Sequence, residues 1–255
     1  WDNFGIQDAE MIGYWEEDCP VRTSRDDVLA TVYLKEGEAL IALASWPEHR
    51  TPRANLPAAD TAPDIDGTLS EGEWTAAAKL TNFVQLGGQE LAEDQTDAYV
   101  TYDDERLYVG FHCEHPHDEL KTDATGHDSQ VWTDDAVELF VQPDVQEDTY
   151  YQLIGNSAGV TSENRNKDID WDCEWQFAAT TAQEYWEAEL SVGLGELGMT
   201  IPAGGARIGV NVCRDRQVPA QELSSWAPGG ATFHEPDTFG QLVFSTKGAV
   251  TREAR

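Results

Sequence analysis

The sequence predicts an all-β protein, an antiparallel β-sandwich with a separate β-hairpin on its N-terminal side. Short runs rich in Val, Tyr and Phe recur at near-regular spacing, acidic or glycine-rich turns separate them, and helical periodicity is almost absent. These runs predict strands at 98–102, 107–113, 136–142, 149–155, 173–181, 185–192, 206–214 and 239–245. One segment differs, because Ser70 and Glu73 fit a capping box, so residues 70–79 predict one or two helical turns.

Residues 1–50 predict a unit of their own. The apolar runs 27–34 and 39–46 flank a tight turn at Lys35–Glu38, and the second run is apolar on both faces, as in a strand buried between layers. Because a lone hairpin is unstable in water, we expect this block to be the tail of a preceding β-domain. The proline-rich stretch that follows predicts a linker. The expected domains are 1–50 for the tail, 51–63 for the linker, 64–246 for the sandwich and 247–255 for a terminal extension.

Charge is the strongest compositional signal. The chain has 48 Asp and Glu residues against 16 Lys and Arg, a formal net charge of −32. Such a surface repels phosphate backbones and anionic lipid, which argues against nucleic-acid and membrane partners, and no apolar run approaches the ~20 residues of a membrane-spanning helix. Only five of the 16 cations are Lys. Acid-rich, Lys-poor surfaces suit salty environments, where screening removes self-repulsion, so we expect a halophilic source.

The four cysteines predict neither a zinc ribbon nor a redox pair, because no CxxC spacing occurs. Cys113 and Cys213 each end a strand-like run and can be neighbours in a sheet. A disulfide between them is one alternative. Two buried free thiols are the favoured one, because Cys often serves as a small apolar residue.

Five motifs follow one another in the second part of the chain: Asp64-Ile65-Asp66-Gly67 with Glu71–Trp74, then YVTYDDERLYVGFHCEHP, WTDDAVELFVQP, YYQLIGNSAG, and VNVCRD with Trp226-Ala227-Pro228 and PDTFGQLVF. In this order they resemble family 9 carbohydrate-binding modules and related DOMON-like sandwiches. Residues 9–46 are similar to the closing β-segment of large glycoside-hydrolase-like proteins. The two resemblances imply a non-catalytic module that binds a mono-, oligo- or polysaccharide, with an upstream catalytic domain in the same polypeptide.

The resemblance also implies a binding site. The family holds a terminal sugar between two aromatic rings and binds its hydroxyls with charged and amide side chains. Trp132 matches the first family Trp, Glu138 matches the family carboxylate six residues later, and Trp226 matches the second ring. Where the family has a basic residue, this chain has Gln152. With two polar candidates near strand ends, the expected site residues are Trp132, Glu138, Gln152, Asn156, Arg214 and Trp226.

Strand alternation supports part of this site. In residues 136–142, Glu138 and Phe140 share one face, while the aliphatic residues between them point to the other. Gln152 reaches the face of Glu138 if the register sets the two opposite each other. The alternative is that Glu138 forms a structural ion pair with Arg214.

Two other functions compete with carbohydrate binding. Paired carboxylates such as Asp134 and Glu138 can serve glycosidic-bond hydrolysis, which needs two such groups about 5–9.5 Å apart. However, 48 acidic residues generate such pairs by chance, and no nucleophile elbow, P-loop or dinucleotide fingerprint occurs. DOMON-like sandwiches can also hold haem between Met and His, but Met199 is the single methionine within the expected module. We therefore expect no catalysis by this chain.

No cofactor is expected, with one exception that comes from the resemblance. The histidines at 112, 115 and 117 lie close together in sequence but lack a recognised metal-ligand spacing. Members of the family can carry structural calcium, and the acid-rich loops offer the oxygen ligands that calcium prefers, although no EF-hand spacing occurs. The resemblance thus implies calcium as the one candidate ion.

The start of the chain carries no targeting signal. It opens at Trp1 without Met, a basic segment or an apolar segment, so we expect no signal peptide within this sequence. We expect the chain to be the C-terminal part of a longer polypeptide. The resemblance implies an extracellular or cell-surface location.

Overall fold

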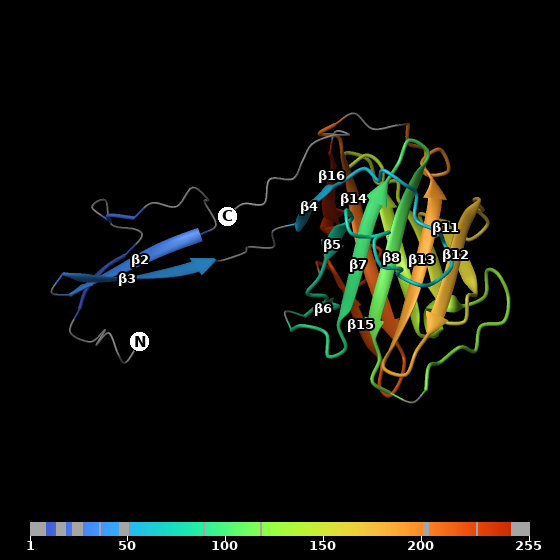
Figure 1. Cartoon of the computed structure of the whole chain (residues 1–255), viewed down its shortest axis with the longest axis horizontal. Coiled ribbons are helices and arrows are strands. Elements are labelled where there is room, and N and C mark those ends of the chain that lie inside the picture. The colour runs from blue at the N-terminus through green and yellow to red at the C-terminus, as the bar shows by residue number, and fades with distance from the viewer. Residues whose placement is uncertain are drawn as a thin grey trace. The chain divides into compact units, whose positions relative to one another are not determined.

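The computed structural model describes residues 9–13, 19–21, 28–35, 37–45, 51–88, 90–117, 119–200, 204–227 and 229–245. These residues fall into two compact units, one within residues 1–50 and the other within 51–255. Figure 1 draws both units, and the second holds the sandwich.

The first unit is a three-stranded antiparallel sheet. Its strands, in spatial order, are β1 (Glu10–Ile12), β2 (Val28–Lys35) and β3 (Glu38–Ser45). Lys35 pairs with Glu38, and Gly37 takes a φ of 87° in the turn, as a tight hairpin requires. The predicted hairpin is therefore confirmed. Ile41, in the run expected to be buried between layers, is 50% exposed here, and its burial against a preceding domain stays a prediction. Trp46 lies outside the described residues.

The second unit is the β-sandwich that the sequence predicts (Figure 1). The larger sheet has the order β11-β10-β9-β14-β15-β6, and β16 pairs with both β14 and β4. The smaller sheet has the order β12-β13-β8-β7-β5 and lies in front in Figure 1. Neighbouring strands are antiparallel except for β4 and β16, which pair in parallel. Among the described residues, no helix has the length and apolar character needed to cross a membrane.

The strands of the larger sheet are β4 (Arg53–Leu56), β6 (Val84–Gln85), β9 (Ala136–Gln142), β10 (Tyr151–Asn156), β11 (Thr161–Arg165), β14 (Arg207–Arg216), β15 (Glu222–Ser225) and β16 (Gly240–Phe244). Those of the smaller sheet are β5 (Ala78–Leu80), β7 (Thr96–Tyr102), β8 (Arg106–Glu114), β12 (Trp175–Thr181) and β13 (Tyr185–Gly193). The short 3-10 turns η2 (Val131–Thr133) and η3 (Pro236–Thr238) precede β9 and β16. All eight strands expected from the sequence are present, with ends that differ by a few residues.

Alternation along the strands fills the space between the sheets. In β9, Val137 and Leu139 are buried in the main core, whereas Phe140 belongs to a second apolar cluster on the outer face of the larger sheet. The ring of Phe177 on β12 packs directly on Gly155 of β10, where an added β-carbon would overlap it. A larger residue at this point would require the Phe177 ring to move.

The segment 64–77 packs on the smaller sheet. Glu189 of β13 accepts the backbone N–H groups of Asp66 at 3.0 Å and Gly67 at 2.9 Å, and the indole N–H of Trp74 at 2.9 Å. Burial raises the pKa of the Glu189 carboxyl, and these donors oppose the rise. The helical turns expected over 70–79 are wrong, since residues 71–77 form separate turns. Anchoring at both Gly67 and Trp74 competes with a helical hydrogen-bond pattern.

Part of the expected linker is a strand. Residues 53–56 form β4, which pairs with β16, and Leu56 is fully buried in the main core. The expectation of a linker over 51–63 is therefore wrong for these residues, because pairing with a distant strand outweighs their weak strand composition. The expected extension at 247–255 lies outside the described residues.

The cysteines are free thiols. Cys113 belongs to the core between the sheets, whereas Cys213 belongs to the cluster on the outer face of the larger sheet. The two are therefore not neighbours in a sheet, and the favoured alternative of buried free thiols is confirmed.

Candidate functional site

A pocket of ≈ 460 Å³ opens on the outer face of the larger sheet. Strands β9, β10, β11 and β14 supply its floor, and the loops before β9, after β11 and before β16 supply its walls. Of the six expected site residues, it contains Trp132, Glu138 and Gln152. Further residues that line it and bear on its chemistry are Asn164, Lys167, Ile169, Asp215, Phe233 and His234.

Trp132 is presented to solvent by the turn η2. Val131, one residue earlier, is fully buried in a small cluster with Ala136 and Ile154. This anchor directs the next side chain outward, and Trp132 is 46% exposed. The side-chain amide of Gln217 donates to the Trp132 carbonyl at 3.2 Å. The indole is therefore a flat apolar surface on a turn that is held in place.

The floor of the pocket carries a hydrogen-bonded row of polar side chains. Gln152 Nε2 donates to Glu138 Oε2 at 2.6 Å, and Asn164 Nδ2 donates to Gln152 Oε1. In the strand register, Gln152 lies opposite Phe140 and Glu138 lies opposite Ile154. Glu138 and Gln152 are thus diagonal neighbours on one face. The two side chains therefore share a face, although the register sets them two residues away from direct opposition.

Asp215 of β14 brings a second carboxyl to the floor. It is buried and hydrogen-bonds with Glu138. Burial raises the pKa of both carboxyls, and the charge of Glu138 raises that of Asp215 further. Because two carboxylates repel, such a hydrogen bond needs a proton between them. Within the described part of the chain, no donor reaches Asp215 Oδ2.

The wall facing the floor residues is aromatic. Phe233 belongs to the outer apolar cluster with Phe140 and Tyr150. His234 Nδ1 lies 3.0 Å from the hydroxyl of Tyr150. Burial lowers the pKa of His234 to about 4, and the charge of Lys167 contributes. The imidazole is therefore neutral at ordinary pH and can exchange hydrogen bonds with an uncharged ligand.

A tight turn after β11 forms part of the rim. Asn166 and Lys167 both have positive φ values, 52° and 67°, and Arg165 pairs with Asp168 across them. This is the backbone pattern of a two-residue hairpin turn. It brings the Lys167 ammonium and the exposed apolar side chain of Ile169 to the pocket.

Asn156 and Arg214 lie outside the pocket. Asn156 is buried beside η2, where its Nδ2 donates to Asp134 Oδ2 at 2.8 Å. Arg214 is buried and donates to the carbonyl of Asp94 at 3.2 Å. Glu138 pairs with Cys213 in the register, so Arg214 points to the opposite face of the sheet. The alternative ion pair between Glu138 and Arg214 is therefore wrong.

Trp226 also lies outside the lining of the pocket. Its ring packs against Gly240 and the main core, where an added β-carbon on the glycine would overlap it. The loop chosen from the sequence does reach the pocket, but it does so with Phe233 and His234. The family resemblance favoured the Trp of this loop, and nothing in the sequence distinguishes a Trp on the core from a Phe at the pocket.

Asp215 was missed although a signal was present. Alternation in β14 places Cys213 and Asp215 on one face and Arg214 on the other. Glu138 of β9 lies on the same face as Asp215. Alternation alone would therefore have placed Asp215 beside Glu138 if β9 and β14 had been known to be neighbours. The order of the strands in the sheet could not be predicted from the sequence.

The histidines at 112, 115 and 117 do not converge. His112 Nδ1 lies 2.9 Å from Glu187 Oε1, His115 Nε2 lies 2.8 Å from a backbone carbonyl, and His117 Nε2 lies 3.0 Å from Asp94 Oδ2. They have three different partners. Met199, the methionine considered for haem, packs against the main core.

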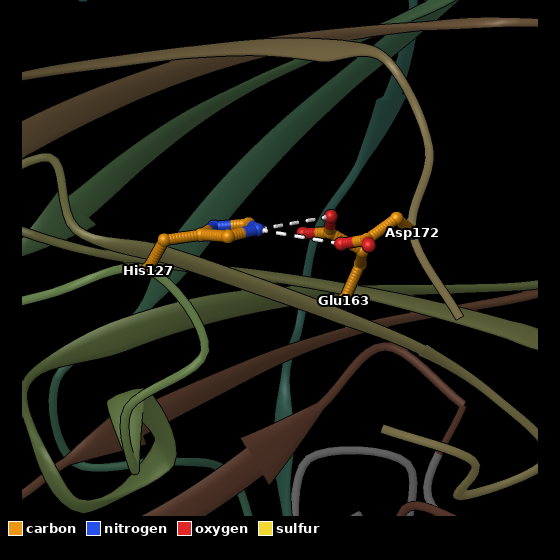
Figure 2. A group of neighbouring side chains, drawn as sticks. All are labelled: His127, Glu163 and Asp172. Atoms are coloured by element: carbon orange, nitrogen blue, oxygen red, sulfur yellow. Dashed lines mark ion pairs between the residues drawn. The ribbon is translucent and has the colours of Figure 1, made fainter. Parts of the chain in front are cut away.

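A different group has the composition of a metal site. His127, Glu163 and Asp172 bring one ligand atom each within 4.8 Å of one another (Figure 2). Calcium takes oxygen ligands in sets of six to eight, so a group that includes an imidazole nitrogen does not fit it. Within the residues the structure describes, this group gives no support to the calcium that the resemblance implies.

Comparisons with known proteins agree on the fold. Residues 65–247 match the family described as carbohydrate family 9 binding domain-like, and residues 1–57 match the C-terminal domain of glycoside hydrolase 123. A search of curated proteins found no match.

Three solved structures are similar to this chain. A Bacteroides uniformis protein of proposed carbohydrate-binding function is 16% identical, with a TM-score of 0.63, and the match covers 76% of this chain and 99% of that one. A family 9 carbohydrate-binding module from Caldicellulosiruptor kristjanssonii, in complex with cellotriose, is 16% identical, with a TM-score of 0.58 and coverage of 80% and 100%. A module of that family and organism in complex with glucose is 14% identical, with a TM-score of 0.58 and coverage of 78% and 100%. At these identities the likeness concerns the fold. Because the family match spans most of the chain, this protein belongs to the carbohydrate family 9 binding domain-like family.

Proposed function

We propose that the pocket on the outer face of the larger sheet binds carbohydrate without chemical turnover. The observation that carries this proposal is an exposed indole, Trp132, beside a floor of buried and mutually oriented polar side chains. Sugars present C–H patches on their faces and hydroxyls on their edges. A pocket that pairs an aromatic surface with fixed polar groups complements both.

The floor offers several kinds of hydrogen-bonding group. The amide of Gln152 is held between Glu138 and Asn164, so its orientation is set before a ligand arrives. The carboxyl pair of Glu138 and Asp215 adds acceptors, and burial raises the pKa of both, which favours a proton on the pair. Such preorganisation lowers the entropic cost of fixing a ligand. The identity of the partner as an uncharged, hydroxyl-rich molecule follows from this mixture of donors and acceptors.

The known relatives suggest the first ligands to test. The two Caldicellulosiruptor modules were solved with cellotriose and with glucose. We therefore take glucose and cellotriose as probes for this chain.

The arrangement of acids in this pocket argues against glycosidic-bond hydrolysis. Glu138 and Asp215 are both buried and interact with each other directly, whereas retaining and inverting enzymes keep their two carboxyls about 5–9.5 Å apart to admit the reacting groups. Asp134, the other acid considered, uses its oxygens to accept the N–H groups of Asp123 and Ala124 and the amide of Asn156. Neither pair is arranged for proton transfer to a leaving group.

We also propose that this chain is part of a longer carbohydrate-degrading protein. The match of residues 1–57 to the C-terminal domain of glycoside hydrolase 123 supports a role as the binding module of a longer carbohydrate-degrading protein. Modules of this kind act where polymeric substrates are, which favours an extracellular or cell-surface location.

Calorimetric titration of glucose and cellotriose tests the proposal. Trp132→Ala is expected to weaken binding at least about tenfold, or about 1.4 kcal/mol, because the stacking surface is lost. The matched control is Tyr185→Ala, which removes an aromatic ring of 39% exposure from β13 of the other sheet. Circular dichroism of both variants should match that of the unaltered chain. Equal affinity in Trp132→Ala, or release of product from an aryl glycoside, would contradict the proposal.

A further inference from the structure

Beside the edge strand β11, three side chains from different segments converge on one point. His127 lies in the loop before η2, Glu163 in β11, and Asp172 in the loop between β11 and β12. Figure 2 shows the imidazole edge pointing at both carboxylates. His127 Nε2 lies 3.4 Å from Glu163 Oε1 and 3.7 Å from Asp172 Oδ1. A further carboxylate, Asp128 Oδ2, lies 3.5 Å from the same nitrogen.

These distances fit ligands around an ion better than direct hydrogen bonds. An N–H···O bond has a mode near 2.9–3.0 Å, and none of the three contacts of Nε2 is that short. Two ligands at about 2.0–2.1 Å from a tetrahedral ion lie about 3.3–3.4 Å from each other. The separation between Nε2 and Glu163 Oε1 falls in this range, and small rotations of two exposed side chains bring in the others.

The imidazole is oriented by contacts behind it. His127 Nδ1 lies 3.3 Å from Thr161 Oγ1 on β11. If the hydroxyl accepts from Nδ1–H, the Nε2 lone pair faces the carboxylates. Metal-bound histidines are commonly held by such a partner on the other ring nitrogen. The loop itself is fixed because the Asp128 backbone N–H donates to the Thr161 carbonyl at 3.1 Å.

The burial of Glu163 also indicates a bound ion. Its side chain is only 2% exposed, yet it lines a pocket of ≈ 500 Å³. Oε1 lies 3.4 Å from His127 Nε2, while Oε2 accepts the indole N–H of Trp175 at 2.9 Å. Burial raises the pKa of this carboxyl, and Trp175 and His127 oppose the rise. A buried carboxylate aimed at an imidazole and two exposed carboxylates is stabilised when a cation joins it.

We propose that His127, Glu163 and Asp172, with Asp128 as a fourth candidate, form a binding site for a divalent transition-metal ion of the zinc class. An imidazole with two or three carboxylates suits a borderline ion and leaves positions for water. The thiol of Cys173 also lines this pocket, but it is not part of the group of ligand atoms that lie within 4.8 Å of one another. The guanidinium of Arg106, which also lines this pocket, is bonded to Ser191 at 3.1 Å and 2.9 Å.

The position of the site gives it a structural role. His127 lies five residues before Trp132, and Asp172 lies three residues after Ile169, so both loops continue into walls of the proposed sugar pocket. An ion at this point ties the two loops to the edge strand β11. We expect the ion to stabilise the fold by binding the native state and not the unfolded chain.

Zinc binding to the chelator-treated, reduced full chain tests this proposal. Calorimetry in about 1 M NaCl, where the Debye length is about 3 Å, suppresses diffuse binding of cations to the −32 surface. We expect a single Zn²⁺ per chain and a higher melting temperature with Zn²⁺. Asp172→Asn and His127→Gln should each weaken binding at least about tenfold. Asp172 is 78% exposed, so its substitution leaves the fold intact.

The control variant is His112→Gln, which disrupts another histidine–carboxylate pair, with Glu187 at 2.9 Å. It should bind Zn²⁺ like the unaltered chain. Co²⁺ should give d–d bands without a thiolate charge-transfer band. The proposal is overturned if no Zn²⁺ binds, if both ligand variants bind it equally well, or if Ca²⁺ displaces Zn²⁺ at equal concentration. No sugar is present in these measurements, so their outcome is independent of the carbohydrate proposal.

Discussion

Glu138 and Asp215 are both almost fully buried at the bottom of the pocket. Burial disfavours the charged form of each, and the proximity of the second carboxyl adds to the cost for Asp215. A proton held between them turns one carboxyl into a hydrogen-bond donor. Since a sugar hydroxyl both donates and accepts, such a pair can satisfy it in either sense.

Asp215→Asn tests the shared proton through the pH dependence of stability. The folded pKa of Asp215 is raised above the unfolded value near 3.9, so its stabilising contribution is present below about pH 4 and is lost as pH rises through the folded pKa. The asparagine variant escapes this loss. Its melting temperature should therefore exceed that of the unaltered chain by an amount that grows from pH 4 to pH 8.

Asp60→Asn is the matched control, because it removes the same charge from an exposed position. Comparing the two variants cancels the general effect of a net charge of −32. A melting-temperature difference for Asp215→Asn that stays constant with pH, or equals that of the control, would show that no proton is held at the pair.

Individual residues of the site were predictable to different degrees. Trp132 and Glu138, to which the family resemblance points, were found in the pocket, and the alternation along β9 agrees for Glu138. Trp226 was not, since its ring covers Gly240 and the core. The packing partners of an aromatic residue are often distant in sequence, and a single sequence does not reveal which residues they are.

The strands of the larger sheet position the residues of the pocket, and the packing of the two sheets constrains those strands. Gly155 of β10 faces the ring of Phe177 on β12 with no space for a β-carbon. The next residue, Asn156, donates to the side chain of Asp134, which ends the turn that carries Trp132. The spacing of the sheets is thus coupled to the geometry of the pocket.

Gly155→Ala should lower the free energy of unfolding by about 1–3 kcal/mol, because the new methyl group overpacks the core. Urea denaturation measures this change. Gly195→Ala is the control, since nothing lies within 4 Å of an added β-carbon there.

Adding Phe177→Leu to Gly155→Ala should recover part of the lost stability, because it makes room for the methyl group. Residues in contact show non-additive effects of this kind. If the effects of the two substitutions simply add, the glycine is not required by the phenylalanine ring.

Long hairpins were easier to predict than short strands. The pairs β7–β8, β9–β10 and β12–β13 follow from alternation and a turn between two runs. β4, β6 and β15 have two to four residues each, and partners distant in sequence hold them. Composition alone cannot reveal an element whose stability comes from its neighbour.

The molecule as a whole is divided near residue 50. The contact pattern separates residues 1–50 from 51–255, and the two family matches meet between residues 57 and 65. The sandwich contains its own core, including Leu56 of β4. The halophilic source expected from the acid-rich composition stays a prediction.

Two truncated chains test where the independent module begins. The chain 51–255 should unfold cooperatively at the melting temperature of the sandwich in the full chain, because β4 still pairs with β16. The chain 65–255 should melt lower, since it loses that pairing and the buried side chain of Leu56. Equal melting temperatures would mean that β4 adds nothing to the sandwich.

The central claim, that carbohydrate binds beside Trp132 on the larger sheet, is tested most directly by nuclear magnetic resonance. In a ¹⁵N-labelled chain titrated with cellotriose or glucose, the indole N–H signal of Trp132 and the amide signal of Gln152 Nε2 should shift. The indole signals of the buried Trp74 and Trp186 should stay in place. Shifts confined to another region, such as Trp175 beside Glu163, with the Trp132 signal unchanged would contradict the claim.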